Sequence, residues 1–213
     1  MRVIVVGAVD EIMELIRELI DKGHEVVVLD DDNTRIDRFV QELDVAVYLF
    51  SLFDLTTFMR AGMHKADIVL AVHPVDTVNV LVCIYAKSFA VPKIYAVVSS
   101  VHTANVLNKL GFAERVLVKS TSVRRSLIEL IYGVRIIELD EKNYIVMLTL
   151  SDVNHLENKK VEEIEEQGAK VLAVLDSENN PINYDKDYVL KRGEKIIIKI
   201  NKGSMEPLLF KYR

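Results

Sequence analysis

The sequence predicts an α/β protein in which a Rossmann-like, doubly wound parallel sheet is followed by a small α+β domain. Two observations support this fold class. Up to residue 134, short β-branched runs alternate with helical patterns, an order typical of parallel sheets with right-handed crossovers. Beyond it, successive runs alternate in part between apolar and polar residues, as strands with one solvated face do. We therefore expect domains at residues 1–134 and 135–213, with a linking helix at 122–133 in the first.

The first strand and helix are expected at the start of the chain. Residues 3–6 are all β-branched and predict a strand. The following helix has one apolar face at the i, i+3, i+4 spacing, formed by Ile12, Leu15, Ile16, Leu19 and Ile20. Gly23 and His24 end this helix. A second strand is expected at 25–29, where the continuous apolar run at 26–29 indicates that it is covered on both faces.

The same alternation continues through the first domain. The second helix carries Ile36, Phe39, Val40 and Leu43 on one face. Further strands are expected at 46–49, 68–72, 94–98 and 115–118, with helices at 55–61, 76–89, 103–110 and 121–133. Gly133 ends the last of these helices.

The second domain is expected to be smaller and partly antiparallel. Its elements are strands at 134–139 and 144–150, a polar helix at 159–167, a strand at 171–176, the turn SENNP and a strand at 195–200.

Composition excludes several classes of protein. Half of the 213 residues are hydrophobic and 28% are charged, which is typical of an ordered globular chain. The formal net charge of −5 provides no basic field for phosphate backbones, so we expect no nucleic-acid partner. Apolar runs such as 68–72 and 80–86 are far shorter than the roughly 20 residues that span a bilayer. Because no signal peptide is evident at the start, we expect a cytoplasmic protein.

The single cysteine is expected to be inert. Cys83 lies in the apolar run VLVCIYA, which predicts a buried thiol. One cysteine forms neither an internal disulfide nor a multi-cysteine metal site.

The first strand-to-helix turn is the place where a doubly wound fold holds a pyrophosphate. A GxGxxG fingerprint that begins at Gly7 requires glycine at positions 9 and 12, where this chain has Val9 and Ile12. The neighbouring carboxylates of Asp10 and Glu11 would repel a pyrophosphate by roughly 1–4 kcal/mol per close charge pair. Only the first glycine of the phosphate-binding pattern is therefore present.

An acidic residue follows the second strand at the position that binds ribose hydroxyls in such folds. Asp30 stands about 20 residues after the glycine turn. An acid at this position disfavours a 2′-phosphate, so NADP is the least expected ligand. The alternative is that residues 30–32 form an acidic loop in which Asp32 caps the next helix.

Motifs along nearly the whole chain resemble the RCK domains (also called KTN or TrkA-N) that regulate potassium channels and transporters, followed by their TrkA-C domain. In the first domain these are MRVIVVGA, GHEVVVLDDD, MRAGMHKADIVLAV, the Asp76 and Asn79 of HPVDTVN, and VPKIYAVV followed by VLNKLG. In the second, residues 156–200 follow the TrkA-C pattern of a helix, a strand, a hairpin, a Gly-Glu pair and a final apolar strand.

The resemblance implies a regulatory subunit rather than an enzyme. It implies pairing with itself as a homodimer or higher ring, on the cytoplasmic face of an integral-membrane potassium channel or transporter. Ligand binding or assembly would then shift the conformation that biases the gate. The ligand implied is an adenine nucleotide or NAD(H), held at the matching positions Gly7, Ala8, Val9, Asp30, Asp31, Ser51, His73, Asp76 and Asn79.

Two motifs depart from the family's nucleotide site. The glycines at positions 9 and 12 are replaced, and the acidic GDA-type motif after the third strand reads Phe50-Ser51-Leu52, with only the later Asp54 kept. We therefore expect a nucleotide site that is weakened, altered or lost.

The sequence leaves two other functions open. An NAD-dependent oxidoreductase needs an acid or base near the nicotinamide, and among His24, His64, His73, His102 and His155 only His73, after the fourth strand, is placed to face the crevice. A ligand-free interaction module would use the helix at 122–133, whose Leu127, Ile128, Leu130 and Ile131 exceed what one buried face needs. That helix either crosses to a partner subunit or packs on its own domain.

Overall fold

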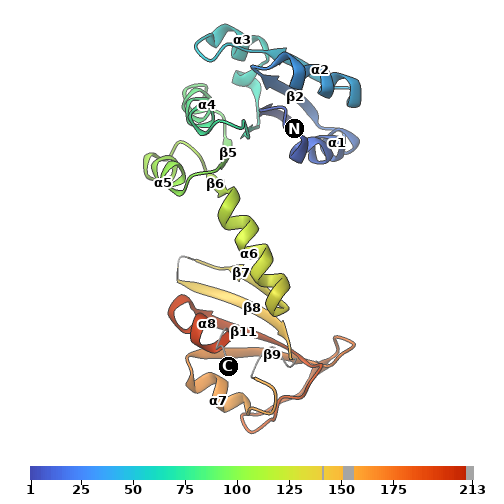
Figure 1. Ribbon diagram of the computed structural model, residues 1–213, viewed down its shortest axis with the longest axis vertical. Coiled ribbons are helices and arrows are strands. Elements are labelled where there is room, and N and C mark those ends of the chain that lie inside the picture. Colours follow the sequence, from blue (N-terminus) through green and yellow to red (C-terminus); the bar gives the residue numbers. More distant parts are fainter. Residues whose placement is uncertain (141, 151–155, 210–213) are drawn as a thin grey trace. The chain divides into compact units, whose positions relative to one another are not determined.

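The computed structural model describes residues 1–140, 142–150 and 156–209 (Figure 1). The chain divides into two compact units, Met1–Val123 and Arg124–Arg213. The division falls within helix α6 (Lys119–Tyr132), ahead of the expected domain boundary at residue 134, which stays a prediction. His155, one of the five histidines considered above, lies outside the described residues.

The first unit is built on a six-stranded parallel sheet with the order β3-β2-β1-β4-β5-β6. Its strands are β1 (Arg2–Val6), β2 (Glu25–Asp30), β3 (Ala46–Leu49), β4 (Ile68–Ala71), β5 (Lys93–Val98) and β6 (Arg115–Val118). The strand order reverses between β1 and β4, which is the switch point where Rossmann-type sheets bind ligands. The predicted doubly wound fold is confirmed.

Helices cover both faces of this sheet because alternate residues of each strand point to opposite faces. Ile4 and Leu29 belong to one apolar core with α3 (Leu55–Arg60), α4 (Asp76–Ser88) and α5 (Val101–Leu110). Val5 and Val28 belong to the other core, with α1 (Met13–Asp21) and α2 (Asn33–Glu42). Two short 3-10 helices, Asp10–Ile12 and Met63–Lys65, complete the unit.

Side-chain caps explain where some helices begin. Asp32 accepts hydrogen bonds from the N–H groups of Thr34 and Arg35, so it caps α2 as predicted. Helix α5 begins at Val101, two residues before the predicted start, because Ser100 accepts from the N–H groups of His102 and Thr103. The first helix also differs, since a 3-10 turn precedes α1.

The second unit contains a five-stranded antiparallel sheet with the order β10-β9-β11-β8-β7. Its elements are β7 (Val134–Glu138), β8 (Asn143–Thr149), α7 (Val161–Glu166), β9 (Ala169–Leu175), β10 (Pro181–Ile182), β11 (Lys195–Asn201) and α8 (Lys202–Leu209). Helix α8 was not predicted, because Gly203 and Pro207 lie within it. Its Leu208 and Leu209 are nevertheless buried in the core of this unit.

Two expectations from composition can be compared with the structure. Cys83 is buried, and burial raises the pKa of its thiol to about 12, so the predicted burial of this thiol is confirmed. Among the described residues, every helix is too short or too polar to cross a bilayer.

Candidate functional site

The turn after β1 packs directly against the end of β4. Gly7 adopts a φ of +116°, and a Cβ atom at this position would lie 2.5 Å from the backbone nitrogen of His73. The N–H of Gly7 donates to the carbonyl oxygen of Leu29 at 2.8 Å. Only glycine fits this position because both the conformation and the close approach exclude a side chain.

Asp30, at the end of β2, is the buried centre of the crevice. Its Oδ2 accepts the backbone N–H of Ala8 at 2.6 Å, and its Oδ1 accepts that of Asp32 at 2.9 Å. The guanidinium of Arg35 donates to it through Nε at 3.0 and 3.1 Å and through Nη2 at 2.6 Å. Asp30 is fully buried, and both of its oxygens are occupied by donors of this chain.

These contacts hold Asp30 in its charged form. Burial alone would raise its pKa, but the hydrogen bonds from Arg35, Ala8 and Asp32 act in the opposite direction. Their combined effect lowers the pKa of Asp30 below the ordinary value of 3.8. The carboxylate therefore stays ionised, and the same contact raises the pKa of Arg35.

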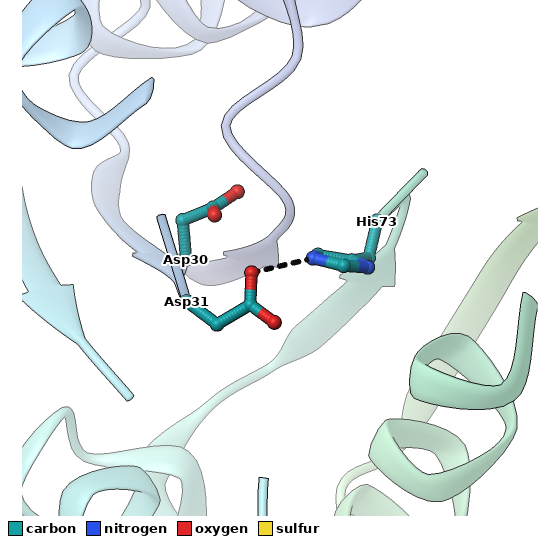
Figure 2. A group of neighbouring side chains, drawn as sticks. All are labelled: Asp30, Asp31 and His73. Atoms are coloured by element: carbon teal, nitrogen blue, oxygen red, sulfur yellow. Dashed lines mark hydrogen bonds and ion pairs between the residues drawn. The ribbon is translucent and has the colours of Figure 1, made fainter. Parts of the chain in front are cut away.

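His73, which follows β4, closes the cluster from the other side. Its Nε2 lies 2.9 Å from Oδ1 of Asp31, the contact drawn in Figure 2, and 3.2 Å from Nη2 of Arg35. Its Nδ1 accepts the N–H of Val75 at 3.2 Å. In the neutral ring the proton is therefore on Nε2 and is donated to Asp31.

Asp30, Asp31 and His73 come close enough to suggest a metal site. One donor atom from each lies within 4.8 Å of the others. However, Arg35 binds both carboxylates and contacts His73, so a guanidinium already supplies the positive charge that a metal ion would bring. The donor set does not fit a metal in this arrangement.

Two further predicted residues frame the crevice rather than line it. The side chain of Asn79 is fully buried. Its Oδ1 accepts the N–H of His73 at 2.8 Å, and its Nδ2 donates to the carbonyl oxygens of His73 and Val97 at 2.7 and 2.9 Å. Asp76 accepts the N–H groups of Ser99 and Ser100 at 2.9 and 3.0 Å. Both residues tie the start of α4 to the ends of neighbouring strands.

A cavity of about 310 Å³ opens beside this cluster. It is lined by Ala8, Val9, Asp10, Glu11, Thr34, Arg35, Arg38, Pro74 and Lys119. Gly7, Asp30, Asp31 and His73 lie next to these residues through the contacts described above. Ser51, in contrast, is exposed in the loop after β3 and is not one of these lining residues. The ring of its neighbour Phe50 packs edge-on against His73, with centroids 6.4 Å apart.

The cavity wall carries ion pairs that the sequence did not predict. Nη1 of Arg38 lies 2.7 Å from Oδ2 of Asp10, and Nζ of Lys119 lies 3.7 Å from Oε1 of Glu11. A bound phosphate would compete with these carboxylates for the two cations. Arg35 was also missed, although a cation in the first turn of α2, four residues after Asp31, is a usable signal for an ion pair.

A second cavity, of about 390 Å³, lies on the side of β5 and β6. Its walls are mostly apolar and comprise Val9, Glu11, Ile12, Val72, Val97, Leu117, Lys119, Ser122 and Val123. Val9, Glu11 and Lys119 line both cavities. The crevice of the first unit therefore has a charged part and an apolar part.

Comparison with known proteins gives consistent matches. Residues 3–118 match the TrkA-N domain family. The Trk system potassium uptake protein TrkA homolog of Methanothermobacter thermautotrophicus is 23% identical over 215 residues, covering 97% of this chain and 96% of that protein.

Solved structures of similar fold include ligand complexes. The GsuK channel bound to NAD matches with a TM-score of 0.63 at 18% identity over all of this chain, which spans only 40% of that channel chain. The Kef C-terminal domain of Shewanella denitrificans in its AMP-bound form matches with a TM-score of 0.51 at 19% identity, covering 62% of this chain and 80% of that one.

Proposed function

This chain belongs to the TrkA-N domain family, and from that premise we propose that it is a regulatory subunit of a potassium uptake system or channel. The observation that carries the proposal is the match to a TrkA homolog along nearly the full length of both chains. The antiparallel second unit supports it, since it has the helix and strands expected of a TrkA-C-like domain at residues 135–213.

The proposed effector site is the crevice at the switch point of the parallel sheet. Adenine nucleotides or NAD(H) are the ligands proposed, because the similar folds above were solved with NAD and AMP. The residues proposed to form this site are Gly7, Ala8, Val9, Asp30, Asp31 and His73, and Asp76 and Asn79 would hold the neighbouring loops. Ser51 would take part only from the adjoining loop.

A regulatory role fits this crevice better than hydride-transfer chemistry. The Nε2–H of His73 is donated to Asp31, so it is not presented to a substrate as an acid or base. We therefore propose that ligand binding or assembly acts through conformation and that the chain is not an enzyme. Its location would be cytoplasmic, at the inner face of the membrane through its partner.

Helix α6 supports the proposed self-association. None of its described side chains is buried, and Leu127, Leu130 and Ile131 are 52%, 78% and 65% exposed. Covering such side chains is favourable at roughly 25 cal/mol per Å². A homodimer or higher ring would cover them with a second copy. The same observation favours the second candidate, a ligand-free interaction module, since the oxygens of Asp30 are already occupied.

Co-purification from solubilised membranes tests the proposed partnership. The chain is tagged, expressed from its own locus and isolated in mild detergent, with an untagged strain as the control. We expect an integral-membrane potassium channel or transporter subunit to be enriched with it. Enrichment of cytoplasmic proteins alone, repeated after crosslinking, would contradict the proposal.

A further inference from the structure

Arg35 contacts Asp30 and also reaches the cavity beside the glycine turn. The guanidinium reaches back from the first turn of α2 and binds both oxygens of Asp30. Arg35 also lines the 310 Å³ cavity beside the glycine turn. It therefore stands between the cavity and the acid.

A ribose at this site needs an accessible carboxylate. In Rossmann folds the acid after the second strand accepts hydrogen bonds from ribose hydroxyls. The side chain of Asp30 has 0% exposure, and the acceptor sites that Ala8 and Asp32 leave open are filled by Arg35. Ribose hydroxyls can reach Asp30 only after the guanidinium has left.

Further contacts keep the guanidinium in place. Its Nη2 donates to Oδ1 of Asp31 at 2.9 Å. Its Nη1 lies 3.5 Å from Oδ2 of Asp32. Because three carboxylates share one cation, moving Arg35 away from Asp30 would leave a buried carboxylate without its partner.

We propose that Arg35 is the specificity-determining residue of this crevice, because it withholds Asp30 from the ribose hydroxyls of adenine nucleotides. This inference rests on the proposed nucleotide site, and it names the residue that decides whether the site recognises a ribose. The two donors of the guanidinium take the place that the 2′- and 3′-hydroxyl donors of a ribose would have. Wild-type protein thus does not distinguish a ribose from a dideoxyribose.

A ribose-specific binding experiment tests this inference on the full chain. The probes are ADP and 2′,3′-dideoxy-ADP, measured by calorimetry or equilibrium dialysis. The variants are Arg35→Met, which removes the guanidinium but keeps an aliphatic side chain, and Arg17→Met on α1 as a matched surface control. Arg17 pairs only with exposed acids, Glu14 and Glu42, among the ion pairs of the described residues. Arg35→Gln replaces Arg35→Met if the latter does not fold.

The expected result is that the Arg35 variant gains binding affinity only for the ligand that carries ribose hydroxyls. Wild type and Arg17→Met should bind the two ligands equally, or neither measurably. Arg35→Met should bind ADP about tenfold more tightly than wild type and about tenfold more tightly than it binds the dideoxy analogue. Adding Asp30→Asn to that variant should abolish the discrimination.

Three results would overturn the inference. The first is a wild type that already binds ADP about tenfold more tightly than the dideoxy analogue. The second is a folded Arg35 variant that binds ADP no more tightly than wild type. The third is an Arg35 variant whose affinity rises by the same factor for both ligands. The proposed function is tested separately, by measuring potassium flux in the presence and absence of the wild-type chain. Flux that depends on this chain, together with no gain in the Arg35 variants, contradicts only the role of Arg35.

Discussion

Nη2 of Arg35 lies 2.6 Å from Oδ1 of Asp30, and this contact joins the first turn of α2 to the end of β2. Asp30 has no exposed surface, whereas the side chain of Arg35 is 31% exposed. The pair therefore stabilises the crevice and limits access to it at once.

Asp30→Asn should destabilise the first unit. The amide would place its NH2 group opposite the N–H of either Ala8 or Asp32 and would leave Arg35 without its charged partner. We expect the free energy of unfolding to fall by about 3 kcal/mol. Asp31→Asn is the control, since Asp31 is 40% exposed and should contribute less than about 1 kcal/mol. Urea unfolding followed by circular dichroism measures both, and equal losses would contradict the prediction.

The stabilisation from Asp30 should depend on pH in a defined direction. The pKa of Asp30 is lower in the folded chain than its ordinary value of 3.8. Its contribution is therefore fully present above 3.8 and is lost as the pH falls through the lowered folded value. The difference in free energy of unfolding between wild type and Asp30→Asn should be the same at about pH 7 and about pH 5 and smaller at about pH 3. If this difference in free energy of unfolding is already smaller at about pH 5 than at about pH 7, the pKa of Asp30 is not lowered by folding, and the prediction is contradicted.

Gly7→Ala should cost far more stability than the same change at Gly23. Both glycines have a positive φ, +116° and +75°, which costs an L-residue about 1–2 kcal/mol. A Cβ at Gly23 meets no atom within 4 Å, whereas one at Gly7 would lie 2.5 Å from the backbone of His73. We expect Gly7→Ala to lose at least about 2 kcal/mol more than Gly23→Ala. Thermal and urea unfolding measure the stability of both variants. Similar losses of stability would contradict the prediction, because they would mean that the end of β4 moves easily away from a Cβ at position 7.

Leu130→Lys should weaken self-association. Leu130 is 78% exposed on α6, so a lysine is tolerated in the single chain but disfavoured in an apolar interface. We expect wild type to elute as a homodimer or larger ring and the variant to shift toward the single chain in light scattering coupled to gel filtration. Val40→Lys, on α2 and 57% exposed, is the matched control. A monomeric wild type would contradict the proposed pairing.

The parallel fold could be predicted because its strands have a simple pattern. Residues 3–6 and 26–29 are continuous apolar runs, and both lie in strands that are buried on two faces. Helix α8 could not be predicted from its own residues, because Gly203 and Pro207 disfavour a helix. Burial of Leu208 and Leu209 against the second core, a tertiary contact, accounts for it.

The candidate site was predictable only in part. Asp30 could be identified from its distance to the glycine turn, and its position at the end of β2 is observed. The partners of its carboxylate depend on which way side chains point after folding. Arg35 reaches it across a strand-to-helix loop, and Lys119 pairs with Glu11 from more than a hundred residues away. The pairing of Lys119 with Glu11 arises from the topology of the sheet and has no local sequence signature.

Rubidium uptake by living cells tests the regulatory role most directly. The strain lacks the gene for this chain, and uptake is measured at low external potassium with and without a plasmid that restores it. Regulation of a potassium transport system predicts a change in the uptake rate of about fivefold or more, reversed by the plasmid. Unchanged uptake in the deletion strain, with the membrane transporter present and active, would contradict it.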